Sequence, residues 1–110
     1  MEALCVEITT DGKDQWIKKS GISDFEHTSS SALLSIITEA GIAGMGGAGF
    51  PTSVKLNPGF QRPVDTLIIN ATECEPYITA DDSLIRERAE EIVEGIRILS
   101  HILGNPHNIL

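Results

Sequence analysis

A chain of 110 residues is long enough for one modest hydrophobic core and too short for two full domains. Its formal net charge of −8 argues against nucleic acid or an anionic membrane as a direct partner. A hydrophobic content of 41% indicates a globular chain, yet no apolar run approaches the ~20 residues that a transmembrane helix requires, and the N-terminus does not resemble a signal peptide.

The first residues favour β-structure. Residues 4–9 carry β-branched side chains at strand spacing, the turn signal Asp11-Gly12 follows, and residues 16–17 could begin a return strand. We therefore expect residues 1–28 to be the end of an upstream β-rich region and a linker. Cys5 is predicted to be a small buried residue. Because Cys5 and Cys74 lack ligand spacing and nothing else indicates secretion, reduced thiols are expected, although the count allows one disulfide.

A helix is predicted over residues 33–40. Three serines before it offer N-caps, and its apolar side chains recur on one face. Gly41 stands where a left-handed C-cap belongs, and Ile42 could fold back onto Ile37 in a Schellman arrangement. The helix is therefore expected to end just before the most unusual stretch of the chain.

That stretch is a glycine loop with four glycines in the six residues 44–49. They are Gly44, Gly46, Gly47 and Gly49. Such a loop suits positive φ angles and close approach of a ligand to the backbone. Pro51 favours a helical turn over residues 52–56, so loop amides with Lys55 nearby are expected to make an anion cradle that suits a phosphate. A surface loop with tight turns remains the alternative. The sequence does not fit a Walker loop, and it does not fit a dinucleotide-binding fingerprint either, because that motif follows a strand and this loop follows a predicted helix.

A second polar segment follows a strand predicted over residues 65–70, which we expect to be covered on both faces. Beyond it lies an acidic corner, which comprises Asn70, Thr72, Glu73, Cys74 and Glu75. Ligands of open α/β sheets collect at such strand ends, although a solvated acidic turn is an equal alternative. We predict no metal site, because no histidine lies at ligand spacing, and no catalytic residue, because Cys74 lacks an evident base.

The longest predicted helix starts at the Thr79 cap and ends before Gly104 and Pro106. Its apolar stripe has 4-3-4-3-4 spacing and comprises Ile85, Ala89, Ile92, Ile96, Leu99 and Leu103. Charged residues cover the rest, with pairs such as Arg86 and Glu90. His101 and His107 are expected at the surface without partners. Residues 108–110 resemble a new strand, so the end of the chain is predicted to be a βαβ unit cut short.

Two motifs in this order are similar to those of one family. The glycine loop and the residues after it, Gly-Met-Gly-Gly-Ala-Gly-Phe-Pro-Thr-Ser-Val-Lys, resemble the flavin-binding loop of the NADH-oxidising subunit of respiratory complex I. Residues 68–76, Ile-Ile-Asn-Ala-Thr-Glu-Cys-Glu-Pro, resemble its second flavin and nucleotide motif. The Glu-Cys-Glu-Pro-Tyr form is most similar to the C subunit of Rnf electron-transport complexes, over essentially the whole chain.

The resemblance implies a partial Rossmann-like, FMN-binding α/β domain with parallel strands and flanking helices, preceded by a short β segment. Residues 29–110 would be its N-terminal half, truncated at both ends. The loop glycines, Thr52 and Lys55 would hold FMN, and Asn70 would hydrogen-bond the flavin. Phe50, Glu73 and Glu75 would border NAD(H), and Thr72 would also belong to the cofactor-binding residues. We expect the glycine loop and the acidic corner to face one cavity.

The family also implies a function. The intact subunit would transfer electrons between NAD(H) and FMN, as part of an oxidoreductase complex at the cytoplasmic side of the bacterial inner membrane. Partners would be the other subunits and ferredoxin or NADH, and [4Fe-4S] clusters would lie only in a C-terminal region. The isolated chain is expected to be inactive and to bind FMN weakly. This chain has Met45, Thr72 and Tyr77 at positions where complex I usually has an arginine, an acid and a glycine. Because these differences bear on nucleotide binding, a non-catalytic docking scaffold is the alternative.

Overall fold

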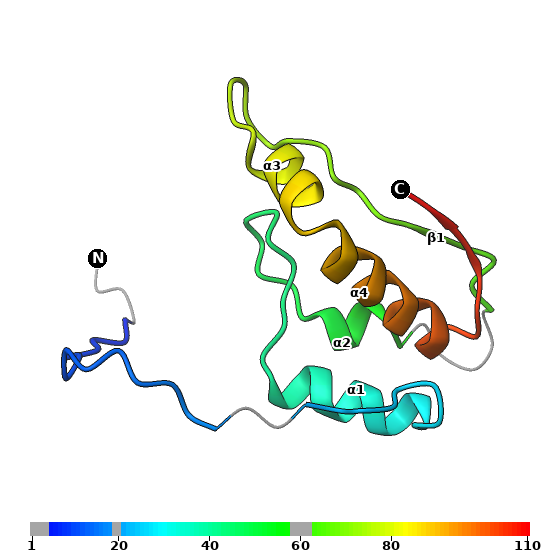
Figure 1. The fold of residues 1–110 in the computed structure, drawn as a ribbon, viewed down its shortest axis with the longest axis horizontal. Coiled ribbons are helices and arrows are strands. Elements are labelled where there is room, and N and C mark those ends of the chain that lie inside the picture. The colour runs from blue at the N-terminus through cyan, green and yellow to red at the C-terminus, as the bar shows by residue number, and fades with distance from the viewer. Residues whose placement is uncertain (1–4, 19–20, 58–62) are drawn as a thin grey trace.

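The computed structural model describes residues 5–18, 21–57 and 63–110. Its elements are α1 (Ser30–Glu39), α2 (Thr52–Lys55), β1 (Thr66–Ile68), α3 (Ala80–Glu87), α4 (Ala89–Ile102) and β2 (His107–Ile109). Figure 1 shows the helices gathered to one side of the two strands, while the first residues extend away from them. The arrangement is of the α/β class, and none of the helices in these ranges is long and apolar enough to cross a membrane.

The ends of α1 follow the predicted capping signals. The Ser29 hydroxyl accepts a hydrogen bond from the N–H three residues later, at 3.3 Å. At the other end Gly41 has φ of +66°, its N–H donates to the Thr38 carbonyl, and the Ile42 N–H donates to the Ile37 carbonyl at 3.3 Å. These two bonds form the predicted Schellman motif, which turns the chain toward the glycine loop.

A small core joins α1, α2 and α4. Its buried members are Leu33, Ile37, Leu56 and Ile102. The predicted stripe is correct for Leu99 and Leu103, which pack against this cluster, but it omits Ile102, which is only 8% exposed. The buried side chains come from α1, from α4 and from Leu56, the C-cap residue of α2, so this core fixes α2, and with it one end of the glycine loop, against α1 and α4.

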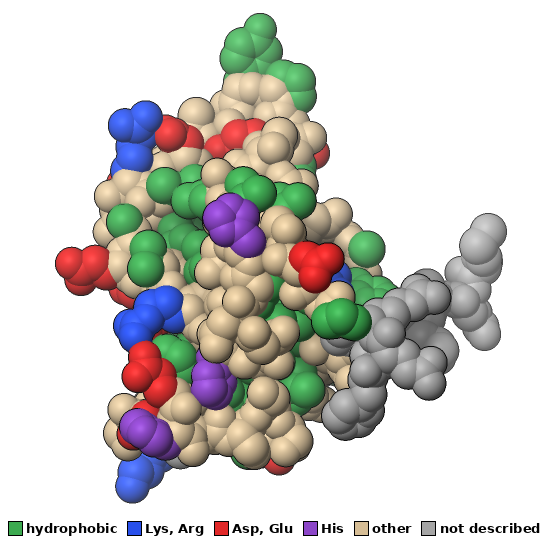
Figure 2. Space-filling view, turned by 90° about the vertical axis from the view of Figure 1, so that its right-hand side faces the viewer, with side chains coloured by type: hydrophobic (Ala, Val, Ile, Leu, Met, Phe, Trp, Pro, Cys, Tyr) green, Lys and Arg blue, Asp and Glu red, His purple; other side chains and the backbone are tan. Residues whose placement is uncertain are grey.

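The two strands form the predicted parallel pair. β1 and β2 align Thr66 with His107 and Ile68 with Ile109, and the connection between them runs through α3 and α4. One face of the pair is open rather than covered, since Ile68 is 68% exposed and Ile109 is 46% exposed. Figure 2, which shows the side of the molecule that carries the strands, has hydrophobic side chains at its surface.

The predicted long helix is two helices. Arg88 has φ of −130° and ψ of 33°, outside helical values, and separates α3 from α4. The predicted pair between Arg86 and Glu90 is therefore wrong, because the two residues lie on different helices. Arg86 instead pairs with Asp82, one turn back on α3, at 2.9 Å. This hydrogen bond and the charge of Asp82 raise the pKa of Arg86 above its ordinary value.

The β-structure predicted for the first residues is wrong. Residues 5–18 form no strand, and Val6 and Ile8 are 87% and 78% exposed. Cys5, predicted to be buried, is exposed, and it is a free thiol like Cys74. Alternating β-branched residues favour a strand only where a neighbouring strand accepts their hydrogen bonds, and none of the described segments does so here. Leu4, the first residue of the predicted strand, lies outside the described residues.

Residues 24–28, predicted to be linker, contact α4. Phe25 packs against the core, and the Glu26 carboxylate pairs with Arg97. His101, expected to lack a partner, is half-buried, and its Nε2 lies 3.1 Å from the Thr28 carbonyl oxygen. The boundary after residue 28 stays a prediction.

Candidate functional site

The glycine loop is closed by short backbone contacts. The Gly44 N–H donates to the Phe50 carbonyl at 2.8 Å, and the Thr52 N–H donates to the Ile42 carbonyl at 3.0 Å. These bonds tie the start of the loop to its end, just before α2. Residues 45–49 therefore form the tip of a narrow, hairpin-like turn.

The backbone donors of this tip are free. In the part of the chain that the structure describes, no N–H of residues 45–49 donates a hydrogen bond, and all five residues are exposed. Gly47 and Gly49 have φ of +90° and +59°, values that side chains rarely allow. A Cβ built on Gly46, Gly47 or Gly49 meets no atom within 4 Å. The glycines thus set the backbone shape and leave space beside the donors.

A cation lies at the base of the loop. The Lys55 Nζ is 2.8 Å from the position that a Cβ on Gly44 would occupy, and 5.8 Å from the centroid of the Phe50 ring. Because Gly44 has no side chain, the ammonium group can rest against its backbone. The structure therefore brings together three predicted site residues, Gly44, Phe50 and Lys55, and places positive charge at the base of the loop.

The acidic corner uses part of its polar side chains internally. The Asn70 Oδ1 accepts from the Thr72 N–H at 3.0 Å, in an Asx-type turn. The Glu73 Oε1 accepts from the Asp81 and Asp82 N–H groups at 2.9 and 3.0 Å, at the N-terminus of α3. Two of the predicted ligand residues thus have structural partners that sequence reasoning missed.

The tip of the corner projects from the molecule. The Ile78 N–H lies 3.4 Å from the Glu75 carbonyl oxygen, which closes a turn with Pro76 and Tyr77 at its centre. Tyr77 has φ of +65°, a left-handed value, and its side chain is fully exposed. The Glu75 carboxylate is exposed, with no hydrogen bond or ion pair among the described residues. These side chains are available to a ligand or to another surface.

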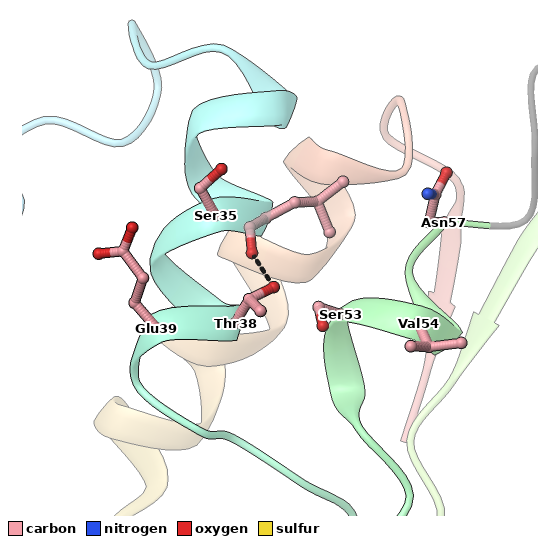
Figure 3. A pocket seen from close by; sticks show the side chains of 7 residues that line it. Ser35, Thr38, Glu39, Ser53, Val54 and Asn57 are labelled. Carbon is pink, nitrogen blue, oxygen red and sulfur yellow. Dashed lines mark hydrogen bonds between the residues drawn. The ribbon is translucent and has the colours of Figure 1, made fainter.

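The described residues show no bond between the glycine loop and the acidic corner. No hydrogen bond, ion pair or ring contact joins them there, and in Figure 1 the ribbon of α3 lies between the two. The shared cavity stays a prediction. Two other cavities are present, a groove of about 410 Å³ between α1 and α2 (Figure 3) and a polar cavity of about 270 Å³ beside Phe25 and Arg97.

Sequence reasoning did not identify the groove between α1 and α2. Polar side chains of α1, of α2 and of the residue that follows the α2 C-cap line much of it, namely Ser35, Thr38, Glu39, Ser53 and Asn57. The spacing of Ser35 and Thr38 on one helix face is the signal that could have indicated it. The Thr38 hydroxyl donates to the Leu34 carbonyl at 2.8 Å, so this group is already satisfied within the helix.

The βαβ unit and the glycine loop are those of a flavin-domain family, and comparison with known proteins agrees. Residues 37–110 match the Nuo51 FMN-binding domain, and the chain belongs to that family. It is 53% identical over 107 residues to the C subunit of the ion-translocating oxidoreductase complex of Citrobacter koseri, and 56% identical to those of Salmonella gallinarum and Salmonella dublin. Each alignment covers 97% of this chain, which spans only about 15–16% of the relatives' length. The expected similarity to the C subunit of Rnf complexes and to the complex I flavoprotein is confirmed.

Proposed function

We propose that this chain forms part of the FMN-binding domain in the C subunit of an Rnf-type complex, where it helps to hold FMN for electron exchange with NAD(H). The domain would be Rossmann-like, with residues 29–110 as its first half. The observation that carries the proposal is the set of free, exposed amides at residues 45–49 with the Lys55 ammonium beside Gly44.

These residues fit an anionic group such as the FMN phosphate. Bare backbone N–H groups bind phosphate oxygens well, and a nearby lysine adds a charge-assisted contact worth about 1.5–3 kcal/mol. The chain as a whole carries a charge of −8, which repels an anion. Local donors must therefore outweigh the overall field, and the glycine loop supplies them in one small region.

The remaining predicted residues take roles around the same cofactor. We assign Gly44, Gly46, Gly47 and Gly49 to the loop around the flavin, with Thr52 and Lys55 at its end. Asn70 would reach the flavin through its amide nitrogen, because its Oδ1 already accepts from Thr72. Phe50, Thr72 and Glu75 would border the nicotinamide nucleotide.

FMN, when bound, supplies the redox chemistry, and the chain contributes its position and its electrostatic surroundings. The other partners are proposals of the same kind. They are the remaining subunits of a membrane complex and ferredoxin or NADH, at the cytoplasmic face of the bacterial inner membrane. Iron–sulfur clusters would belong to another region of the full-length protein.

Flavin retention tests the proposal. In the full-length subunit, Lys55→Ala should weaken FMN binding about 10- to 100-fold, from the loss of one charge-assisted contact. Gly47→Val should also lower the flavin absorbance per protein, because valine resists the left-handed φ at this position. Lys13→Ala removes the same charge from the exposed first segment and should leave the flavin content unchanged. Wild-type flavin content in both loop variants would refute the assignment.

A second measurement separates electron transfer from docking. Anaerobic NADH should bleach the flavin of the full-length subunit if the domain reacts with NAD(H). The internal hydrogen bonds of Asn70 and Glu73 favour the alternative, a scaffold that retains the loop for subunit contact. Flavin that stays bound and unbleached would support the scaffold.

A further inference from the structure

The N-terminus of α3 is capped by a distant carboxylate. Thr79 occupies the N-cap position, but its side chain makes no capping hydrogen bond. The Glu73 Oε1 instead accepts from the Asp81 and Asp82 N–H groups, at 2.9 and 3.0 Å. Two of the donors that a helix leaves unsatisfied in its first turn are thus paired by a residue that lies before the helix.

We propose that Glu73 is a positioning residue, which holds the acidic corner on α3 and does not itself bind the nucleotide. Its carboxylate closes the loop between the end of β1 and the start of α3, and the exposed Glu75 lies inside that loop. The consequence for NAD(H) rests on the proposed function, whereas the capping role does not.

Several contacts make this loop a fixed structure. The Asx-type turn of Asn70 holds its first part, and the turn at Glu75 holds its tip. The Glu73 cap joins both to α3. Without the cap, the hydrogen bond from the Ser83 N–H to the Thr79 carbonyl would still hold the end of this segment at the helix, at 3.0 Å. Residues 73–78 would have no hydrogen bond to α3 among the described residues, and the position of Glu75 would become variable.

Electrostatics favours this use of a carboxylate. The positive end of the helix dipole stabilises an anion at the first turn, and charge-assisted bonds to N–H groups are stronger than neutral ones. Asp82, which also stands in this turn, is paired with Arg86. Glu73 is half-buried, so a nucleotide that required this carboxylate would have to displace bonds that the fold already uses.

Amide hydrogen exchange of the full-length subunit, resolved to single residues, tests the cap. In the wild-type protein the Asp81 and Asp82 amides should exchange more slowly than the Ala80 amide, which donates to no group in the described part of the chain. Glu73→Ala should accelerate exchange at both by about tenfold, from the lost cap and the lost charge. Glu73→Gln keeps an acceptor oxygen and should accelerate it only about twofold. Glu87→Gln, at the far end of α3, should change neither.

The Michaelis constant for NADH separates positioning from contact. If Glu73 acts through the loop, Glu73→Ala raises this constant, whereas Glu73→Gln keeps it near the wild-type value. The two variants should then rank in the same order for the Michaelis constant as for amide exchange at Asp81 and Asp82. The proposal is overturned if Glu73→Gln raises the Michaelis constant for NADH as much as Glu73→Ala does while the Asp81 and Asp82 amides of the Glu73→Gln variant stay protected. The charge of Glu73 would then act directly on the nucleotide. Unprotected Asp81 and Asp82 amides in the wild-type subunit would also overturn it. Failure of the wild-type subunit to retain flavin would instead refute the proposed function and leave the exchange result intact.

Discussion

Replacing Gly47 by alanine tests whether a left-handed backbone shapes the glycine loop. Gly47 has φ of +90°, and a Cβ at this position meets no atom within 4 Å. Steric overlap with neighbours therefore contributes nothing, and the whole effect comes from the backbone angle. Gly46 offers a matched control, because its Cβ would also meet open space and its φ is not positive.

The magnitudes follow from these angles. A left-handed conformation costs a residue with a Cβ about 1–2 kcal/mol, so Gly47→Ala should destabilise the native chain by that amount. Alanine at a compatible angle restricts the unfolded chain, and Gly46→Ala should therefore be neutral or stabilising by about 0.4–1 kcal/mol. The two variants should differ by about 2 kcal/mol, although both add one methyl group to the same loop.

Urea denaturation of this chain, followed by circular dichroism, measures the difference. With a slope of about 1.5 kcal/mol per M, the midpoints of the two variants should lie more than about 1 M apart. Equal midpoints would refute the reasoning, because they would show that residue 47 does not depend on its left-handed angle. A larger loss for Gly46→Ala would do the same and would place strain at the wrong glycine.

Two further predictions concern the core and the loop base. Ile102→Ala should destabilise the chain by about 2–5 kcal/mol in thermal or urea unfolding, because it empties a buried position between α1 and α4. Val93→Ala is the control. Its site is 54% exposed, so this change should cost less than about 1 kcal/mol. Gly44→Ala should leave unfolding within about 0.5 kcal/mol, because only the flexible end of Lys55 must move, yet it should lower flavin retention in the full-length subunit by displacing that ammonium group.

Local signals predicted much of the fold because their physical causes are local. Ser29 and Gly41 mark the ends of α1, since a hydroxyl cap and a left-handed glycine act within a few residues. The apolar run at residues 65–70 and the strand residues at the end of the chain likewise indicated a parallel pair. The ends of α1 depend on chemistry that is readable from neighbouring positions, whereas the strand pair was predicted from the order strand, helix, strand of a βαβ unit.

Features that depend on distant partners were not predictable in this way. The β-branched residues before Asp11 have strand propensity, but a strand forms only with a neighbour. The break at Arg88 interrupts a continuous apolar stripe. The spacing of apolar residues gives no sign that one residue within it has non-helical backbone angles. The same limit applies to the candidate site. Sequence patterns for helix caps include only the N-cap residue and the first turn. Glu73 lies eight residues before Asp81, whose N–H it accepts, and is therefore outside these patterns.

The two parts of the proposed site therefore differ in how the fold prepares them. The donors of the glycine loop stay free, and the contacts that shape it all lie within residues 42–55. The acidic corner consumes acceptors of Asn70 and Glu73 and leaves Glu75 exposed. If the glycine loop holds the flavin and the Glu73 cap positions the acidic corner, a substitution in one part should leave the measured property of the other part unchanged. Lys55→Ala should then lower flavin content without changing exchange at the α3 amides, and Glu73→Ala should change exchange with the flavin retained.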